Sequence, residues 1–313
     1  LLIASFTFVL YKEGLPNRFD PLVLRYTSTN GDHVLADPCM RRTASQIRNG
    51  DICILGKAAS ANPHSIALWG DSHAASFKPG YEDILSQLEL NGLFIGGIGC
   101  PPIPDVLIEN FDSAERCLKA NTETRDYLVR SNTIKTIILH ARWALSIEGS
   151  RYKEESGPPY ILKPAGGSKR REENNMLVVE QALTELIGSL EKSGKSVIIL
   201  GPVPEVGYNV PRIQANNIIW GKSLDIRPTL DEFLNRQAGV IEVFKRLSFT
   251  FPNLVVSYPH EVFCSSGICE IATASDKLLY LDDDHVSEYG ARIISDQMIK
   301  LFDDIVAGSE GYR

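Results

Sequence analysis

From about residue 65 onward, the sequence alternates between short apolar runs and longer stretches with helical periodicity. The apolar runs contain no Asp, Glu, Lys or Arg, as expected for parallel strands that are covered on both faces. They are Ile66–Trp69, Leu93–Ile95, Thr136–His140, Ser196–Leu200 and Leu254–Ser257. The stretches with apolar residues every three or four positions cover 81–90, 176–192, 230–247 and 287–306. This alternation predicts an α/β protein with an open, doubly wound, parallel sheet of about five strands.

The composition is that of a globular protein and argues against a nucleic-acid partner. The chain has 313 residues, 43% of them apolar, which suits one large domain or two modest ones. Its formal net charge is −7 and its basic residues are scattered. The most basic run, 169–171, continues directly into two glutamates, as in a solvated loop. No nucleic acid is therefore expected as a partner.

Six cysteines fall along the sequence as three local couples. They are Cys39, Cys53, Cys100, Cys117, Cys264 and Cys269. Six cysteines allow 15 pairings, of which the nearest-neighbour set is the simplest. The alternative is a zinc site, but no C-x-x-C occurs and only His260 lies within four residues of a cysteine. Disulfides and an oxidising compartment are therefore favoured, and no metal is expected.

The first ten residues are apolar and uncharged. They are too few to cross a bilayer, which takes about 20 residues, and no methionine or basic segment marks a signal peptide. We interpret residues 1–10 as the end of a transmembrane helix of a longer protein; the alternative is a buried strand. Residues 11–62 are mostly polar and hold the first cysteine couple, so we expect an ordered linker or extension there.

One turn between an expected strand and an expected helix carries a serine. Residues 69–74 read Trp-Gly-Asp-Ser-His-Ala, with Ser72 just past the first strand. This position is at the carboxyl edge of the sheet, where such sheets bind ligands and where backbone N–H groups can stabilise an oxyanion. The alternative is that Asp71 or Ser72 only caps the helix.

A second turn, just before the last expected helix, carries a histidine and three carboxylates. Residues 280–287 read Tyr-Leu-Asp-Asp-Asp-His-Val-Ser. Asp282, three residues before His285, can accept a hydrogen bond from one ring nitrogen and leave the other free to take a proton from a serine hydroxyl. The alternative is an acidic surface turn in which Ser287 caps the helix.

Together, the two turns resemble the end motifs of the SGNH (GDSL-like) hydrolase family, over about residues 60–310. The resemblance implies a flavodoxin-like, three-layer α/β/α fold. It also implies that Ser72 is the nucleophile, His285 the general base and Asp282 the residue that orients it. Asp283 and Asp284 stand at the wrong offset for that last role.

Four features make the sequence similar to one subgroup, the SGNH domains fused behind the membrane domain of bacterial acyltransferase-3 proteins, which O-acetylate surface polysaccharides. They are the Gly-Asp-Ser-His-Ala form of the first motif, Cys100-Pro101-Pro102, Ala141-Arg142-Trp143 and the run Tyr280-x-Asp-Asp-Asp-His285. The similarity implies that residues 1–10 end the last membrane helix and that 63–313 form the SGNH catalytic domain. That domain would lie in the periplasm or outside the cell, attached to the bacterial inner membrane.

The same similarity implies a donor and two partners. The partners are the protein's own N-terminal acyltransferase-3 domain and a polysaccharide acceptor such as an O-antigen or lipopolysaccharide. The acetyl group would originate from acetyl-CoA and arrive through the membrane domain, so this domain would bind no cofactor of its own.

The oxyanion hole departs from the family pattern. SGNH enzymes usually add a glycine after the second strand and an asparagine after the third. Here several glycines follow the second strand, of which we choose Gly97, and His-Ala-Arg-Trp follows the third with no asparagine. The expected donors are therefore the Ser72 backbone N–H, with Gly97 and Arg142 as further candidates; a structural ion pair is the alternative for Arg142.

The expected activity is transfer of an acetyl group through an acyl-serine to a sugar hydroxyl. One alternative is a carbohydrate acetylesterase that uses the same three residues, and another is a glycan-binding module without catalysis. Two long stretches without a period, 150–175 and 203–229, are expected either to shape the acceptor site or to form surface excursions.

Overall fold

The computed structural model describes residues 18–29, 34, 36–56, 65–109, 111–166 and 174–310. Residues 1–10, which were expected to end a transmembrane helix, lie outside these ranges, as do parts of the expected linker. Within the described ranges, no helix combines the length and the apolar character that a membrane crossing demands.

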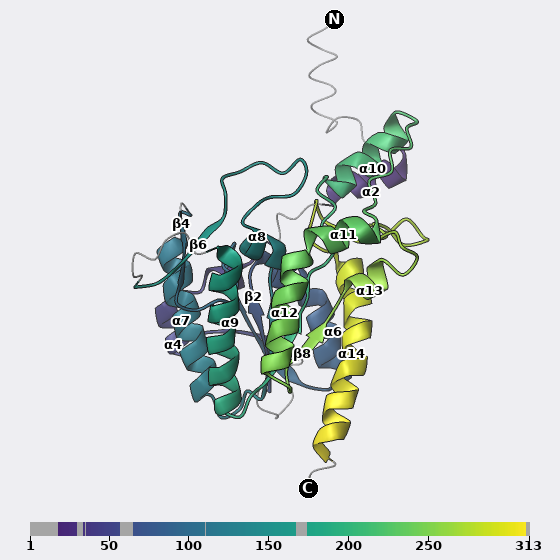
Figure 1. Ribbon diagram of the computed structural model, residues 1–313. Helices are drawn as coiled ribbons and strands as arrows, with labels where there is room; N and C mark the ends of the chain where they lie inside the picture. The colour runs from purple at the N-terminus through teal and green to yellow at the C-terminus, as the bar shows by residue number, and fades with distance from the viewer. Residues whose placement is uncertain are drawn as a thin grey trace, which may run out of the picture.

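A six-stranded sheet forms the centre of the protein (Figure 1). Its strands, in spatial order, are β1 (Cys53–Gly56), β3 (Asn91–Gly96), β2 (Ile66–Gly70), β5 (Thr136–His140), β7 (Ser196–Leu200) and β8 (Val255–Ser257). Neighbours pair in parallel, except that β1 runs antiparallel to β3. The predicted α/β fold with a central parallel sheet is thus confirmed, and the sheet has one further, antiparallel strand at its edge. The chain goes from β2 to β3 on one side and returns to β5 on the other, so β2 lies where the strand order reverses, the place where such sheets bind ligands.

The one strand of this sheet that the sequence did not predict, β1, comes from the segment expected to be a linker. Cys53 and Leu55 are half-buried and Ile54 is exposed, because only one side of this edge strand faces the core. Cys53 lies opposite Phe94 of β3, and its disulfide to Cys39 ties β1 to the 3-10 helix η2 (Pro38–Arg41). Residues 38–56 are therefore an ordered part of the sheet's edge.

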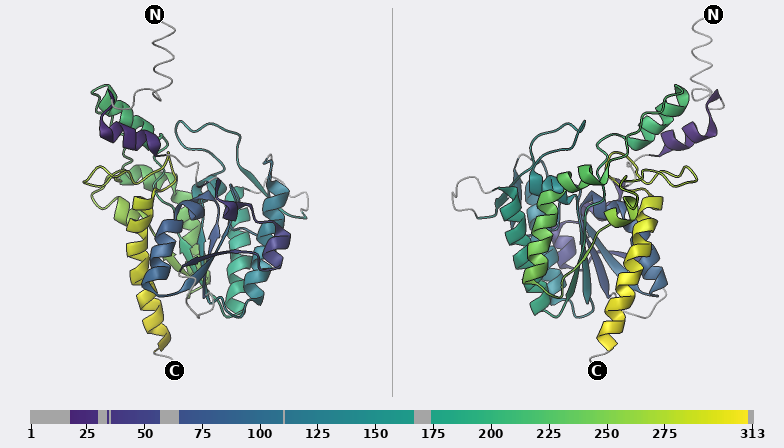
Figure 2. Two further views of the ribbon diagram at one scale, coloured as in Figure 1. Left: turned by 180° about the vertical axis from the view of Figure 1, so that it is seen from behind. Right: turned by 45° about the vertical axis from the view of Figure 1, so that its right-hand side comes forward.

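Helices cover both faces of the sheet, which gives the expected three layers (Figures 1 and 2). Leu68 of β2 contributes to the core under α6 and α14, whereas Ala67 and Trp69 contribute to the core under α7, α9 and α12. The long helices are α6 (Lys78–Gln87), α7 (Ala114–Arg130), α9 (Asn175–Lys192), α12 (Ala238–Thr250) and α14 (Glu288–Glu310). The shorter helices of these layers are α4 (Ala44–Arg48), α5 (Ser72–Ser76), α8 (Trp143–Glu148), α11 (Leu230–Arg236) and α13 (His260–Phe263). The single helix expected over 230–247 is therefore two, α11 and α12.

Both stretches without a clear period contain regular elements. Residues 150–175 include β6 (Ile161–Pro164), which pairs antiparallel with β4 (Val106–Glu109) in a separate ribbon. Residues 203–229 include α10 (Val210–Ile219), which packs against α2 (Pro21–Ser28). The two helices stand away from the sheet, beyond the carboxyl ends of its strands (Figures 1 and 2). We refer to residues 18–29 and 208–227 as the arm.

All six cysteines lie in the described residues and form disulfides with their neighbours in the sequence. The pairs are Cys39–Cys53, Cys100–Cys117 and Cys264–Cys269. No cysteine is left free for the zinc site that was the alternative.

Candidate active site

Ser72 stands where β2 ends and α5 begins. The turn before it requires glycine at position 70, because a Cβ there would lie 1.7 Å from the carbonyl oxygen of His140 on the neighbouring strand. Asp71 caps α5, since its Oδ1 accepts the N–H of His73 at 2.9 Å. The capping role is therefore taken by Asp71, and the hydroxyl of Ser72 is available to another partner.

Ser72, His285 and Asp282 form one chain of hydrogen bonds. Ser72 Oγ lies 2.8 Å from His285 Nε2, and His285 Nδ1 lies 2.8 Å from Asp282 Oδ2. The other oxygen of Asp282 accepts the backbone N–H groups of Asp284 and His285 at 3.0 and 2.8 Å, which fixes the turn. Because an ionised carboxylate can only accept, Nδ1 carries the proton and Nε2 accepts the Ser72 hydroxyl. The structure thus brings together the three residues that the sequence selected.

A second carboxylate, Asp284, which the sequence excluded only from the orienting role, also reaches the imidazole. Its Oδ1 lies 2.9 Å from His285 Nδ1, and its side chain is only 3% exposed. The turn folds so that residues 282 and 284 both face the ring, which sequence spacing alone did not indicate. On its other side, Asp284 Oδ2 lies 2.8 Å from Arg142 Nε and 3.6 Å from His73 Nε2.

The charges in and around this turn shift the pKa values of His285, Asp284 and Asp283. Burial alone would lower the pKa of His285, but the charge of Asp284 and the hydrogen bond to Asp282 outweigh it and hold that pKa well above its usual value. Burial alone would raise the pKa of Asp284, but His285 and Arg142 hold it well below its usual value. Burial and the charges of its two neighbours raise the pKa of Asp283 to about 7. The two carboxylates therefore stabilise the positive charge that His285 gains when Nε2 takes a proton.

The guanidinium of Arg142 lies in a cluster of carboxylates. Its Nε contacts Glu205 at 2.6 Å and Asp284 at 2.8 Å, and its two terminal nitrogens contact Glu155 at 2.8 and 2.6 Å. The side chain is 11% exposed. This geometry matches the ion-pair alternative, because all three nitrogens of the guanidinium already face carboxylates. Glu155 and Glu205 come from the two stretches without a period, so no sequence signal could have found them.

Gly97, the glycine chosen for the oxyanion hole, is not brought to the Ser72 cavity. Its N–H donates to the carbonyl of Gly70 at 3.1 Å, and it lines a different, small cavity. The next two residues, Ile98 and Gly99, line the cavity that contains Ser72.

Ser72 and His285 open into a cavity of about 240 Å³. Its remaining walls carry aromatic, charged and proline side chains, a mixture typical of sites for small polar ligands. They are Asp71, Ile98, Gly99, Glu109, Phe111, Arg142, Leu145, Ser146, Arg151, Glu155, Pro158, Pro159 and Tyr160. The stretch that begins at residue 150 therefore forms part of the wall of the cavity that contains Ser72.

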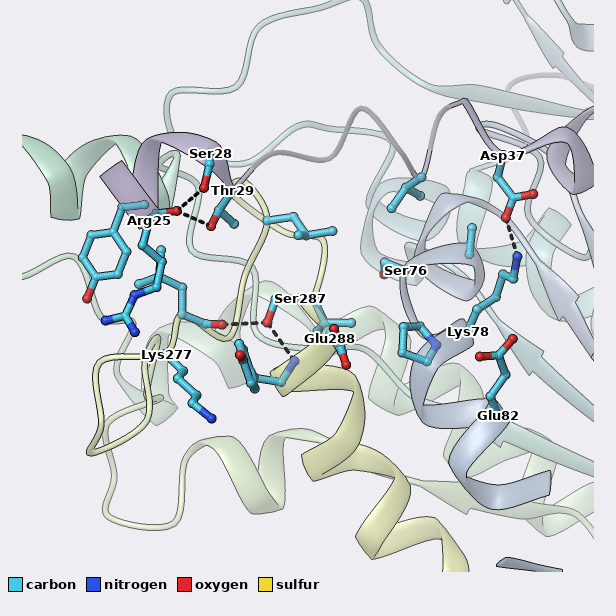
Figure 3. Close-up of a pocket in the computed structure, with 18 of the residues that line it drawn as sticks. Arg25, Ser28, Thr29, Asp37, Ser76, Lys78, Glu82, Lys277, Ser287 and Glu288 are labelled. Atoms are coloured by element: carbon cyan, nitrogen blue, oxygen red, sulfur yellow. Dashed lines mark hydrogen bonds and ion pairs between the residues drawn. The ribbon is translucent and has the colours of Figure 1, made fainter. Parts of the chain in front are cut away.

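A larger cavity, of about 540 Å³, lies on another side of α5 (Figure 3). Figure 3 shows Arg25 and Lys277 on one flank, Lys78 and Glu82 on the other, and Ser287 between them. Ser72, Asp282 and His285 are absent from its lining. We therefore take the smaller cavity, which contains Ser72 and His285, as the candidate active site.

Two groups of described side chains bring possible metal-binding atoms within 4.8 Å of one another. They are His73, Asp284 and His285, and Glu155, Asp283 and Asp284. Both include Asp284, which already faces the guanidinium of Arg142. This fixed positive charge disfavours a metal cation at either place. His140, which packs near His73, donates from Nδ1 to the carbonyl of Leu200, and burial lowers its pKa to about 3, so it is neutral.

The fold and the site together define the class of this protein. A parallel sheet with Ser72 at its switch point, and Asp282 and His285 before the last helix, is the arrangement of the SGNH or GDSL hydrolase folds. A family model described as "SGNH domain (fused to AT3 domains)" matches residues 38–300. The chain therefore belongs to the family of SGNH domains fused to AT3 domains, which confirms the resemblance seen in the sequence and supports an acyl-handling enzyme.

A comparison with solved structures found similar chains, one of which shares this fold with a TM-score above 0.5. The periplasmic domain of a lipopolysaccharide acetyltransferase from Salmonella ser. Paratyphi A is 15% identical with a TM-score of 0.59, over 91% of this chain and 97% of that one. A Bacteroides fragilis protein described as a candidate acylhydrolase is 11% identical with a TM-score of 0.41, over 83% and 94% of the two chains. A GDSL-like lipase from Bacteroides thetaiotaomicron is 9% identical with a TM-score of 0.40, over 78% and 93%. No curated protein matches the chain by sequence.

Proposed function

We propose that this domain is an O-acetyltransferase that moves an acetyl group through an acyl-serine at Ser72 to a sugar hydroxyl of a bacterial surface polysaccharide. The observation that carries the proposal is the hydrogen-bonded chain of Ser72, His285 and Asp282, which opens into a cavity. Membership of the AT3-fused SGNH family and the fold shared with a lipopolysaccharide acetyltransferase domain favour a lipopolysaccharide or O-antigen acceptor.

The proposed reaction has two halves. In the first, Ser72 Oγ attacks the acetyl carbonyl while its proton passes to His285 Nε2, and the leaving group departs with that proton. In the second, a sugar hydroxyl attacks the acyl-serine, gives its proton to Nε2 and becomes the acetyl ester. Ser72 then regains its proton, so the enzyme is unchanged after each cycle.

The surroundings of His285 suit both halves. Asp282 holds the proton on Nδ1, so that Nε2 always faces Ser72. Asp284 places a second negative charge beside the ring, which stabilises the imidazolium that forms in each transition state. We assign oxyanion stabilisation to the backbone N–H of Ser72, with the Ile98–Gly99 backbone in the wall of the same cavity as the place of a second donor.

The acetyl group is proposed to come from acetyl-CoA through an N-terminal membrane acyltransferase-3 domain, so this domain needs no cofactor of its own. The proposal places the domain on the periplasmic or outer side of the inner membrane, with residues 1–10 as the end of the last membrane helix. Disulfides in the described chain suit such an oxidising compartment.

Replacing the nucleophile in the full-length protein tests the proposal. Ser72→Ala should abolish acetylation of the cell-surface glycan, measured by mass analysis of that glycan. Ser76→Ala is the matched control, because Ser76 lies on the same helix but its hydroxyl donates to the carbonyl of His73, away from His285. Glycan acetylation that persists in Ser72→Ala would refute the nucleophile assignment.

The two alternatives predict other outcomes. A carbohydrate acetylesterase would hydrolyse an activated acetyl ester at the same rate with and without glycan, whereas a transferase would divert the acetyl group to the added glycan. A glycan-binding module without catalysis would not react with a serine-directed inhibitor at Ser72.

A further inference from the structure

The arm ends in an apolar tip. At the C-terminal end of α10, Ile218, Ile219 and Trp220 are 37%, 39% and 68% exposed, and Leu224 in the following turn is 56% exposed. The other large apolar side chains exposed in the described residues are scattered over the rest of the fold. Single exposed apolar residues are normal, but several gathered at one protruding place indicate an interaction site.

The arm that carries the tip has a basic composition, although the chain as a whole is acidic, and one of its basic side chains, Arg227, is paired with Asp225 and Glu270. The arm has five basic and two acidic side chains, against a net charge of −7 for the chain. They are Arg18, Arg25, Arg212, Lys222 and Arg227, and Asp20 and Asp225. Exposed Trp and aliphatic side chains flanked by Lys and Arg are typical of surfaces that enter the headgroup region of anionic bilayers. A second copy of the arm fits less well, because it would bring like charges together.

The path of the chain also favours a bilayer as the partner of the tip. The described chain begins at Arg18, just before α2, and α2 packs against α10. Only residues 11–17 separate Arg18 from the apolar residues 1–10, and they can span at most about 30 Å. If residues 1–10 end a membrane helix, as proposed above, the bilayer surface lies within that distance of Arg18, at the start of the arm.

We propose that the tip formed by Ile218, Ile219, Trp220 and Leu224 inserts into the headgroup region of an anionic phospholipid bilayer. This proposal rests on the proposed function only in placing the domain beside a membrane.

Such a contact would fix the active site relative to the membrane. The base of α10 is bonded to the turn that carries His285, since the N–H of Val210 donates to the carbonyl of Asp282 at 3.0 Å and that of Val206 to the carbonyl of Asp283 at 2.9 Å. The ten residues of α10 extend about 15 Å from there. Ser72, at the same edge of the sheet as the arm, would then be held near the bilayer, where an acetyl donor from a membrane domain would emerge.

Tryptophan fluorescence of the 313-residue chain tests this directly. Trp69 and Trp143 are buried, so a change in emission on adding vesicles reports on Trp220. With vesicles of phosphatidylethanolamine and phosphatidylglycerol, the emission should move to shorter wavelength and should be quenched by lipids that carry a shallow spin label. Both effects should weaken as salt is added, because the basic arm is screened.

Variants that retain Trp220 make the test quantitative. Ile219→Ser with Leu224→Ser removes two apolar side chains of the tip and should weaken the Trp220 response to vesicles at least roughly tenfold in lipid concentration. Phe249→Ser is the matched control: Phe249 is 91% exposed, but it lies at the end of α12 that precedes β8, away from the arm. Its response should equal that of the unchanged protein.

Three outcomes would overturn the proposal. Sedimentation with vesicles without any change at Trp220 would show that other residues hold the chain on lipid. An emission shift that depends on protein concentration without vesicles would assign the tip to a second copy. A shift that requires the membrane domain but not lipid would assign it to a protein partner. Without vesicles, the double variant and the unchanged protein should turn over a soluble acetyl ester at the same rate. Failure of the membrane proposal would therefore leave the proposed role of Ser72 unaffected.

Discussion

Two carboxylates approach the same nitrogen of His285 from different surroundings. Asp282 Oδ2 and Asp284 Oδ1 lie 2.8 and 2.9 Å from Nδ1. The Asp282 side chain is 26% exposed and accepts two backbone N–H groups of its own turn. Asp284 is buried and pairs with Arg142, which links it to Glu155 and Glu205 from distant parts of the chain.

This difference indicates that the two carboxylates have separate roles. One orients the imidazole of His285, and the other contributes negative charge beside it. Asp282 makes the hydrogen bond that fixes the tautomer, and it is held by local backbone contacts. Asp284 is held by a buried ion-pair cluster and contributes charge. Replacing one carboxylate at a time should therefore produce distinct kinetic signatures, and Asp283, which lies between them, provides a control.

The largest effect is expected from Asp282→Asn. The amide keeps the shape but offers an N–H to Nδ1, which favours the wrong tautomer and removes the acceptor for the Ser72 proton. Turnover of an activated acetyl ester should fall about 10³- to 10⁴-fold, as for comparable changes in other serine enzymes. A loss smaller than tenfold would mean that Asp284 can orient the ring alone.

Asp284→Asn should have a smaller effect on turnover, about 10- to 100-fold, and should change its pH dependence. The charge of Asp284 raises the pKa of His285, and the base works only when neutral, so the unchanged enzyme loses activity as pH falls through this elevated pKa. Without that charge, the pKa of His285 falls, and the loss of activity moves to lower pH. An acid limb at the same pH in both proteins would contradict the electrostatic role.

The same variant leaves Arg142 without one of its buried partners. We expect its free energy of unfolding to fall by about 3–5 kcal/mol, measured by denaturant titration. The kinetic comparison is therefore made at a temperature where circular dichroism shows both proteins folded.

Asp283→Asn should have the smallest effect on turnover, less than about threefold, because the ion pairs of His285 are with Asp282 and Asp284, and because the pKa of Asp283, about 7, leaves it partly neutral. The main effect of this variant should be on the free energy of unfolding. A carboxyl with a raised pKa in the fold is destabilising once pH rises above its unfolded pKa, most fully above pH 7. The variant should thus match the unchanged protein near pH 4 and be more stable at pH 8, by at most about 4 kcal/mol. Equal stability at both pH values would contradict the shift.

Much of this architecture could be predicted because its signals are local. The buried strands are uninterrupted apolar runs, and the spacing of Asp282 and His285 is set within a single turn. Ser72 directly follows a strand whose carboxyl end must face the ligand edge of the sheet. The cysteine pairs also close short loops, so the simplest pairing is the one in the structure.

The parts that sequence reasoning missed depend on distant contacts. Strand β1 has four residues and exists through its pairing with β3. Asp284 reaches His285 because of the backbone path of the turn and because Arg142, far away in the sequence, faces it. Gly97 looked suitable as an oxyanion donor, but its N–H is used by Gly70 on the neighbouring strand.

The central claim is that Ser72 carries the acetyl group. Intact-protein and peptide mass spectrometry after brief exposure to an activated acetyl ester, followed by acid quenching, tests it most directly. We predict a mass increase of about 42 Da on the peptide that contains Ser72, absent in Ser72→Ala and discharged when acceptor glycan is added. Ester turnover in the unchanged protein without any acetyl group on Ser72, or an equal mass increase in Ser72→Ala, would contradict it.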